Sequence, residues 1–558
     1  MRTSRPLALL AIVVGAVTIR LSPLVSYLYW GADVGEYFAV LRGLVATGHV
    51  STEYAGWGVT YPYFPGMFFV QGALAGLAPL DLTTVVALLV PVLGALAVLP
   101  VFLLGARITG EAKVGLFAAA FVAVAMPHAY STSHTAPSTL GDLLALASVL
   151  LFARVPRDPR AVVPAILVSG ALVLTHHLAT YFLVVIVLVA LALQGLLRAR
   201  PAAGARREAA TFGAFLVATF AFWFGYATTF RDSILRDVAV NPWWLFPAAF
   251  PAGLALLAGA VRLRRRLVWS YRPRLPRLRR SGALYAGTLA FVVGLMAYGA
   301  VVRVPGTAIQ LPASALVLFA PLYAILALSA SGRRFADFLR DGHVVNGAIL
   351  ALVLSAAFGS VAAPHVIIPY RHVEYLVAFL GILAGIGLFR MLDLVSPAGL
   401  RRSGVVAIAG ALLIGNALVA IPPPEVFVGW NEGARPPALD AAYWSRAYVN
   451  GLLAADHRAS SIAFGFGGVD ATWDATRTPF LADDYTAARD GFLQVRAPSG
   501  VRDVAFVWLD DDMERGVQLF PWEPAAPMGS AAVAKFSEAP FVKVFDNGYA
   551  QIFWLGPT

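Results

Sequence analysis

The sequence predicts an all-α polytopic membrane domain followed by a water-exposed C-terminal α+β domain. Of its 558 residues, 59% are hydrophobic and 13% are charged, and the mean hydropathy is +0.73. This composition lies far from that of soluble domains. The apolar residues come in recurrent blocks, and the longer blocks can cross the hydrocarbon core as helices. The chain has no cysteine, so we expect no disulfide, thiolate metal site or cysteine nucleophile.

About thirteen spanning helices are expected in residues 1–420. The first follows Arg2 and Arg5 as a signal peptide would, but no small-residue cleavage site comes after it, so we interpret it as a retained span. The spans are predicted near Leu7–Leu28, Leu82–Ala106, Val114–Met126, Leu140–Phe152, Val162–Leu174, Leu178–Leu197, Phe212–Thr228, Trp244–Val261, Leu284–Val302, Ala313–Leu328, Ala348–Val361, Val373–Phe389 and Val405–Ala420.

Arginine-rich clusters predict the orientation in the cell membrane. They fall in alternate loops, the densest from Arg262 to Arg280, and such clusters stay on the cytoplasmic side, where they also meet anionic lipid. We therefore expect a cytoplasmic N-terminus and an extracytoplasmic C-terminal domain. The net charge of +11 reports this topology and not a nucleic-acid partner, because acidic side chains outnumber basic ones from Ile421 to Thr558.

A long first external loop is predicted at residues 29–81. Its Gly35–Thr47 part has apolar residues at helical spacing, which predicts an amphipathic helix at the membrane interface. The apolar stretch Phe64–Ala78 is too short for a regular span, and a span there would place Arg107 outside. We expect this stretch to form a re-entrant helix.

The C-terminal domain, residues 421–558, is long enough to bury its own core. Its pattern predicts a helix at Leu439–Leu453 and strands at Ser461–Phe464 and Val504–Leu509. Asn547-Gly548 lies between two β-prone runs, which is typical of a hairpin turn. No phosphate loop or Ser/His/Asp motif is evident, so the sequence predicts a supporting or acceptor-binding role for this domain.

Two carboxylates follow the first span in the motif GADVGEY. Asp33 and Glu36 are three residues apart, so on a helix they share a face and could act on one substrate or one cation. Ionisable residues at the membrane usually mark function. The structural alternative is a capping box, with Asp33 as the N-cap and Glu36 as its partner.

The order of these motifs resembles the GT-C glycosyltransferases. An acidic residue in the first external loop, a Tyr-Pro element from Tyr61 to Pro65 and then a span ending in a basic turn is the layout of protein mannosyltransferases, aminoarabinose transferases and oligosaccharyltransferase catalytic subunits. The resemblance covers the whole chain loosely. It implies a polyprenyl- or dolichyl-phosphate sugar donor, and it implies that Asp33 is the catalytic carboxylate, either as general base or as metal ligand. Tyr61 is expected at the substrate.

The second external loop, MPHAYSTSHTAPSTLGD, carries His128, His134 and Asp142. The histidines could contact a phosphate or a metal, or they could simply be solvated. By the resemblance, Asp142 is the nearest counterpart of a second acidic motif that helps hold a divalent metal such as Mg²⁺ or Mn²⁺. His176 and His177 form a further external pair, of which at most one is expected to face a cavity.

The motif PHVIIPYRHVEYLVAF brings Arg371, His372 and Glu374 to the outer mouth of a late span. Arginine offers five fixed donors and a permanent charge, which suits the phosphate of a lipid donor. GT-C enzymes resemble this arrangement in placing an arginine there. The alternative is that Arg371 reaches the headgroups and pairs with Glu374. Arg303 is a second candidate for substrate binding.

Two departures bear on the reaction. The oligosaccharyltransferase subunits carry a WWDYG motif where this chain has FGFGG, Phe464–Gly468, and the loop GTAIQ ends in Gln310 instead of a glutamate. Both favour transfer of a single sugar to a lipid, a glycan or a protein hydroxyl over en bloc transfer to asparagine. The mechanism implied is an inverting displacement. An en bloc transferase, a transporter or flippase for a lipid-linked substrate, and a scaffold remain as alternatives, although the repeats of many transporters are not evident.

Overall fold

The structure is a computed structural model of the 558-residue chain. The predicted span Trp244–Val261, apart from Gly259, and nearly all of the basic segment Arg262–Arg280 lie outside the described residues. The structure describes residues 4–197, 204–240, 259, 278–304, 307–336, 339, 341–362, 366–393, 398–427, 429–519, 523–539 and 541–555.

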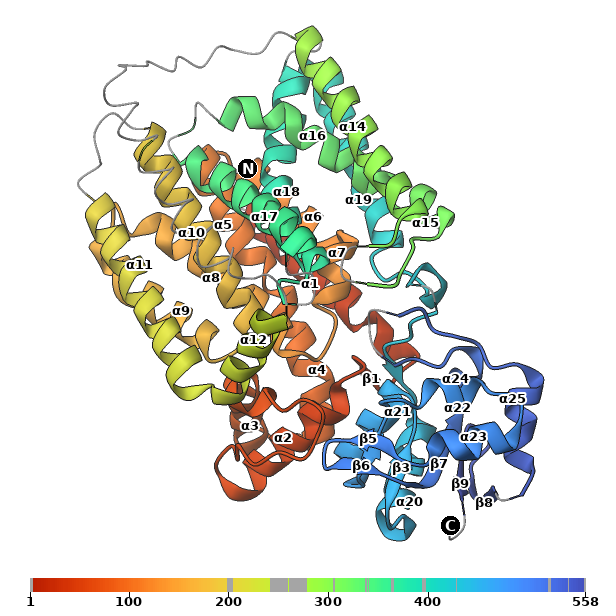
Figure 1. The fold of residues 1–558 in the computed structure, drawn as a ribbon. Coiled ribbons are helices and arrows are strands. Elements are labelled where there is room, and N and C mark those ends of the chain that lie inside the picture. Colours follow the sequence, from red (N-terminus) through yellow and green to blue (C-terminus); the bar gives the residue numbers. More distant parts are fainter. Residues whose placement is uncertain are drawn as a thin grey trace.

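A bundle of helices forms the larger part of the molecule (Figure 1). In its centre α18 packs against α16, α17 and α6, and α10 packs against α17 and α8. The helices of the bundle are α1 (Ser4–Leu21), α4 (Leu82–Ala95), α5 (Val98–Thr109), α6 (Ala112–Val124), α7 (Met126–Ser131), α8 (Pro137–Arg154), α9 (Val162–Val173), α10 (His177–Leu197), α11 (Ala205–Phe220), α12 (Thr228–Val240), α14 (Leu278–Val301), α15 (Ala313–Leu318), α16 (Ala320–Ala336), α17 (Gly342–Ala362), α18 (His372–Asp393) and α19 (Ala398–Leu418).

The polytopic all-α prediction is confirmed. Within the described residues, 8 helices are long and apolar enough to cross a membrane, and four shorter apolar helices accompany them. The predicted span at Leu82–Ala106 consists of two helices, α4 and α5, and α4 contains Pro91. Proline removes a backbone donor and interrupts the helical hydrogen-bond ladder.

The first external loop folds beside the C-terminal domain. The predicted helix at Gly35–Thr47 is present as α2 (Val34–Thr47), and the apolar stretch that follows forms α3 (Gly66–Leu77). The apolar face of α2 is buried in one core cluster with the C-terminal domain, with Phe38 and Leu41 among its members. This face therefore packs against protein.

The C-terminal domain is α+β, as predicted. Its sheet has the order β4-β3-β7-β9-β8, in which β3 runs parallel to β4 and β7 while β9 runs antiparallel to β7 and β8. The strands are β3 (Leu452–Ala454), β4 (Ala471–Thr472), β7 (Val504–Asp510), β8 (Val542–Asp546) and β9 (Ala550–Trp554), and the shorter β5 (Val495–Ala497) and β6 (Gly500–Arg502) pair separately. The helices are α20 (Pro436–Tyr448), α21 (His457–Ile462), α22 (Arg477–Leu481), α23 (Tyr485–Phe492), α24 (Asp511–Arg515) and α25 (Ser530–Ala534).

Local predictions in this domain had mixed outcomes. The strand at Val504–Leu509 and the hairpin around Gly548, whose φ is 82°, are confirmed. The predicted helix ends at Tyr448, and the residues after it enter β3. The strand predicted at Ser461–Phe464 is wrong, because the chain forms α21 and a π-helical turn there. Asp456 begins that helix by accepting a hydrogen bond from the Ala459 N–H, which is a strong N-cap signal.

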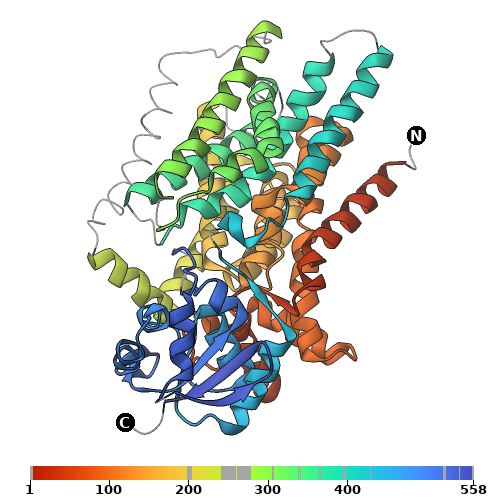
Figure 2. The ribbon, with the colours of Figure 1, turned by 90° about the vertical axis from the view of Figure 1, so that its right-hand side faces the viewer.

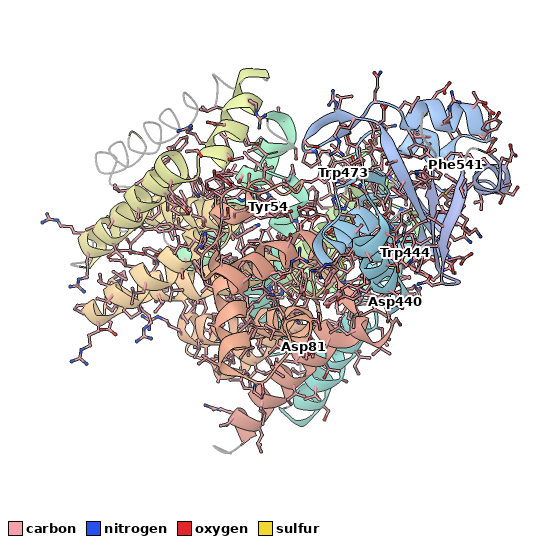
Figure 3. All side chains as sticks on the ribbon, turned by 90° about the horizontal axis from the view of Figure 1, so that it is seen from below. Tyr54, Asp81, Asp440, Trp444, Trp473 and Phe541 are labelled. Atoms are coloured by element: carbon pink, nitrogen blue, oxygen red, sulfur yellow. The ribbon has the colours of Figure 1, made fainter. Side chains whose placement is uncertain are left out.

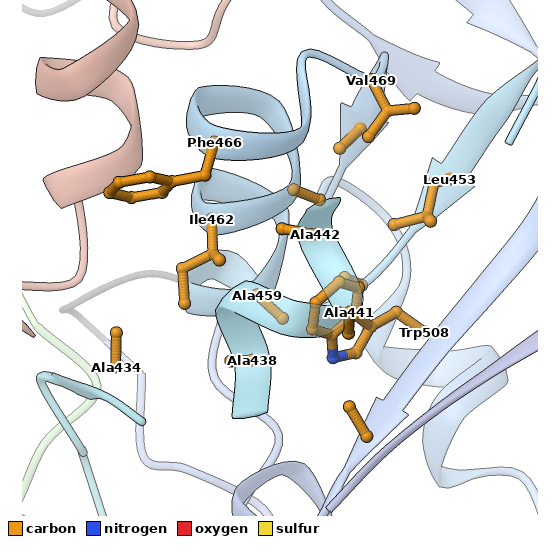
Figure 4. Packing of buried hydrophobic residues seen from close by; sticks show 14 of the residues in the cluster. Ala434, Ala438, Ala441, Ala442, Leu453, Ala459, Ile462, Phe466, Val469 and Trp508 are labelled. Atoms are coloured by element: carbon orange, nitrogen blue, oxygen red, sulfur yellow. The ribbon is translucent and has the colours of Figure 1, made fainter. Parts of the chain in front are cut away.

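The two domains dock through a short sheet and a close helix contact. β1 (Tyr29–Trp30) pairs with β2 (Gly433–Ala434) directly after α1. Phe466 stacks on Phe38 of α2 with ring centroids 4.2 Å apart, in the packing that Figure 4 shows. Figure 2 shows α1 running along one side of the bundle from the N-terminus toward the C-terminal domain.

Candidate functional site

Asp33 lies where the first loop, the bundle and the C-terminal domain meet. It occupies the N-cap position of α2, yet its side chain makes no capping hydrogen bond. The hydroxyl of Ser461, 426 residues beyond Gly35, accepts from the Gly35 N–H at 3.1 Å and from the Glu36 N–H at 3.3 Å. The capping-box alternative is therefore wrong: the C-terminal domain caps α2, and the Asp33 carboxylate is left for other contacts.

Both carboxylate oxygens of Asp33 have partners. Oδ2 accepts from the hydroxyl of Tyr61 at 3.1 Å and from that of Tyr37 at 3.5 Å, while His457 Nε2 lies 3.3 Å from Oδ1. Burial first, and then the negative charge of Asp33, raise the pKa of both tyrosines, so their hydroxyls remain protonated donors. The Asp33 side chain still exposes 34% of its surface, which leaves it reachable by a substrate.

Glu36 has a different environment. Its residue is 3% exposed, and its Oε2 accepts from the Tyr54 hydroxyl and from the Gly58 N–H at 3.1 Å. Burial raises the pKa of Glu36 to about 7 although these two hydrogen bonds lower it. Glu36 thus ties residues 54–58 of the first loop to α2, and it does not share the accessibility of Asp33.

The segment that enters the C-terminal domain forms another wall of the site. Glu432 Oε2 accepts from the Ala32 N–H at 2.8 Å, and Glu432 Oε1 lies 4.0 Å from His134 Nε2. His134 stacks on Trp30. Burial, more than any charge, lowers the pKa of His134, while Glu432 and Asp33 act in the opposite direction. The neutral ring is therefore favoured.

Arg371 lies near this wall at the start of α18. Its guanidinium donates to the Ser131 hydroxyl at 3.0 Å and lies 3.6 Å from the Glu374 carboxylate, which also accepts from Ser131. The predicted pairing of Arg371 with Glu374 is thus present. The Arg371 side chain keeps 32% of its surface exposed, against 5% for Glu374, so the cation and not the anion is accessible.

His134 lies close enough to Asp33 and Arg371 to be influenced by both charges. The same holds for Tyr37, where Asp33 raises the pKa and Arg371 lowers it. The two residues are 338 positions apart in the chain, yet they border one neighbourhood. That the two side chains face one cavity stays a prediction.

Two other predicted site residues are held inside the protein. His372 is 0% exposed, with one ring nitrogen 3.0 Å from the Pro369 carbonyl and the other 2.8 Å from the Ser355 hydroxyl. His128 is 1% exposed and lies 2.9 Å from a guanidinium nitrogen of the buried Arg20. Both histidines therefore brace the bundle and are not placed to contact a substrate directly.

The remaining candidates lie at separate positions. Arg303 is exposed beyond the end of α14. His176 accepts a hydrogen bond from the Ala179 N–H at 3.2 Å, and His177 packs on Phe64 with ring centroids 5.3 Å apart. Through these contacts, His176 and His177 stabilise the start of α10.

The contacts described for Asp142 differ from those of Asp33. Asp142 is 1% exposed within α8, and its carboxylate interacts with Tyr375. The described partners of Asp33 are Tyr37, Tyr61 and His457. None of them is a described partner of Asp142. No group of three or more His, Asp or Glu side chains suited to a metal ion occurs among the described residues. A metal ion held by Asp33 and Asp142 therefore stays a prediction.

Sequence reasoning missed the contributions of the C-terminal domain, namely Glu432, His457 and Ser461. A further pair, Trp57 and Trp473, joins the first loop to this domain with ring centroids 5.1 Å apart. Figure 3 shows Tyr54 and Trp473 where the two parts meet. The only local signal was the Asp456 N-cap, which predicts a helix beginning at His457 but says nothing of its neighbour across the domain interface.

No protein-family model matches the chain, and no curated protein matches it. Solved structures do. An oligosaccharyltransferase of Archaeoglobus fulgidus, crystallised with Zn and sulfate, aligns with a TM-score of 0.57 at 13% identity over 91% of this chain and 68% of its own. ArnT from Cupriavidus metallidurans aligns with 0.51 at 14% identity over 99% of both chains. The mycobacterial arabinofuranosyltransferase AftD aligns with 0.51 at 13% identity over 98% of this chain and 40% of its own.

These similarities establish the fold. The helical bundle with its long first loop and its α+β C-terminal domain shares the fold of these three proteins. At such identities the similarity carries no residue roles, so the site is interpreted from its own geometry.

Proposed function

We propose that this protein is a membrane glycosyltransferase that transfers a single sugar from a polyprenyl-phosphate donor to an acceptor hydroxyl. The GT-C fold supports the class of reaction. The observation that carries the proposal is the partly exposed Asp33 carboxylate, which borders the same neighbourhood as the partly exposed Arg371 guanidinium. An anion that can accept a proton thus lies near a cation that can bind phosphate.

In the proposed reaction the acceptor oxygen attacks the anomeric carbon of the donor. A new carbon–oxygen bond forms there while the bond to the lipid phosphate breaks, and the phosphate leaves with the electron pair. The proton of the acceptor hydroxyl passes to the Asp33 carboxylate, which acts as general base. Arg371 binds the phosphate before and after the bond breaks, and its fork of donors stabilises the growing charge. Attack from the opposite side inverts the anomeric configuration.

The site is proposed to face the extracytoplasmic side of the cell membrane. Support comes from the basic clusters in alternate loops and from α1, which runs from the N-terminus toward the C-terminal domain. Single cysteines can be introduced cleanly because the chain has none. In intact cells an impermeant thiol reagent should label Ser499→Cys, whereas Arg160→Cys should react only after lysis. Labelling of Arg160→Cys alone in intact cells contradicts the orientation.

The decisive assay supplies the purified protein with radiolabelled polyprenyl-phosphate sugars and an acceptor extract. Asp33→Asn keeps the shape of the side chain but removes the base, so kcat should fall by about 10²-fold or more with little change in donor affinity. Arg371→Lys loses the planar fork, and both donor binding and turnover should weaken.

Transfer of label by the wild type with loss in Asp33→Asn supports the proposal. No label on any acceptor across several donors contradicts it. Passage of intact donor across a reconstituted bilayer, with no glycosidic product, identifies a transporter. Transfer of a preassembled oligosaccharide to asparagine instead of a single sugar identifies an en bloc transferase.

A further inference from the structure

We propose that the C-terminal domain completes the catalytic site through His457, which positions the Asp33 carboxylate. The inference rests on the proposed function, because it takes Asp33 as the base that receives the acceptor proton. It gives the C-terminal domain a part in the chemistry beyond support or acceptor binding. His457 is a positioning residue in this account, since it contacts Asp33 and not the reacting atoms.

The Asp33 carboxylate is contacted from two sides. The hydroxyls of Tyr61 and Tyr37 donate to Oδ2, and both belong to the first loop. His457 Nε2 lies 3.3 Å from Oδ1 and comes from the C-terminal domain. A carboxylate that is contacted at each oxygen has little freedom to rotate, and a fixed orientation lowers the entropic cost of reaching the reactive geometry.

The imidazole itself is firmly placed. The His457 side chain is 10% exposed, and its ring lies 5.3 Å from that of Trp473 and 6.0 Å from that of Trp430, measured between centroids. The His457 N–H donates to the Gln518 carbonyl at 2.7 Å. The ring therefore approaches Asp33 from a rigid support, which a positioning role requires.

The backbone on both sides of Asp33 is bound to the same domain. The Ala32 N–H donates to Glu432, and the Gly35 N–H donates to Ser461. Added to the contact of His457 with the side chain, these bonds mean that the C-terminal domain holds Asp33 at three points. A scaffold that only supported the bundle would not need an ionisable side chain directed at this carboxylate.

The test measures kcat and KM in the transfer assay for His457→Ala, His457→Gln and the double variant Asp33→Asn/His457→Ala. His457→Ala should lower kcat by about 10- to 100-fold with little change in KM, which corresponds to the loss of one contact with a charged group. Glutamine can offer an amide N–H near the position of Nε2, so His457→Gln should recover most of the rate. In the Asp33→Asn background, His457→Ala should cause no further loss, because its effect passes through Asp33.

His49→Ala is the control, since His49 is an exposed histidine of the first loop and should leave kcat unchanged. A kcat within twofold of wild type for His457→Ala overturns the inference, and so does a full additional loss in the Asp33→Asn background. Both results differ from failure of the proposed function, in which the wild type itself transfers no sugar. A thermal midpoint of His457→Gln equal to that of wild type shows that the comparison concerns folded protein.

Discussion

At the scale of single residues, burial separates the roles of two neighbouring carboxylates. Asp33 keeps a third of its side chain exposed, whereas Glu36 is enclosed by Tyr54 and Gly58. Asp33 and Glu36 are three residues apart and therefore lie on the same side of the start of α2. Burial increases from Asp33 to Glu36. Asp33 is the group that a substrate can reach, and Glu36 is the group that holds the loop.

Glu36 gives the protein a pH-dependent stability with a defined sign. Its pKa in the folded protein is raised from 4.5 to about 7, so the folded state binds the proton more tightly than the unfolded state. Stability from this group is therefore fully present below about pH 4.5 and is lost as the pH rises through about 7, by about 3 kcal/mol in total. Glu36→Gln keeps an acceptor for Tyr54 and removes this loss.

Thermal midpoints of the detergent-solubilised protein at pH 5 and pH 8 check this expectation. The midpoint of Glu36→Gln should exceed that of wild type at pH 8 and approach it at pH 5. The exposed Glu53 of the same loop provides the control Glu53→Gln, which should follow the wild type. A lower midpoint of Glu36→Gln at pH 8 would show that the carboxylate stabilises the fold in its charged form.

The sequence predicted individual site residues only where the chemistry was visible locally. Asp33 and Arg371 stand out because ionisable groups at the ends of spanning helices are costly and need a reason. Ser461 and His457 could not be found this way, because their partners lie more than 400 residues away in the chain. The burial of His128 and His372 could not be predicted for a related reason, since only the packed bundle shows the partners that enclose them.

At the scale of elements, the contact between α2 and α21 positions the site. Gly35 approaches the backbone of Ser461 so closely that a methyl group at residue 35 would collide with the Ser461 carbonyl, and Gly465 meets the backbone of Gly35 in the same way. The FGFGG segment, Phe464–Gly468, is thus part of the docking surface in this chain.

Gly35→Ala should separate α2 from the C-terminal domain. We expect a lower thermal midpoint and a fall in kcat of about 10-fold or more, because Asp33 lies two residues from the displaced backbone. Gly43→Ala on the same helix is the matched control: no atom lies within 4 Å of an added methyl group, so replacing glycine there should stabilise the protein by about 0.5–1 kcal/mol. Equal behaviour of the two variants would contradict this docking.

Helices and strands were predicted correctly where the sequence has a long, regular hydrophobic pattern or a clear turn signal. Long apolar blocks identified the helices of the bundle, and the Asn547-Gly548 signal located the last hairpin. The strand at Ser461–Phe464 was mispredicted because a short apolar run does not distinguish a strand from a buried helix. The apolar face of α2 was assigned to the membrane interface, yet the structure covers it with the C-terminal domain, which amphipathicity alone cannot foresee.

At the scale of the whole molecule, three parts distant in sequence contribute to one site. The first loop supplies Asp33, the start of α18 supplies Arg371, and the C-terminal domain supplies His457. In the proposed reaction, the docking of the bundle and the C-terminal domain supplies Asp33 as base, Arg371 for the phosphate and His457 to position Asp33.

The most direct measurement of the central claim is a cryo-EM map of the protein with a bound polyprenyl-phosphate sugar analogue that cannot be cleaved. The account predicts that the phosphate lies in hydrogen-bond contact with the Arg371 guanidinium and that the anomeric carbon faces Asp33, with room for an acceptor hydroxyl between them. Density for the phosphate at a cytoplasmic surface, or a sugar directed away from Asp33, would contradict it.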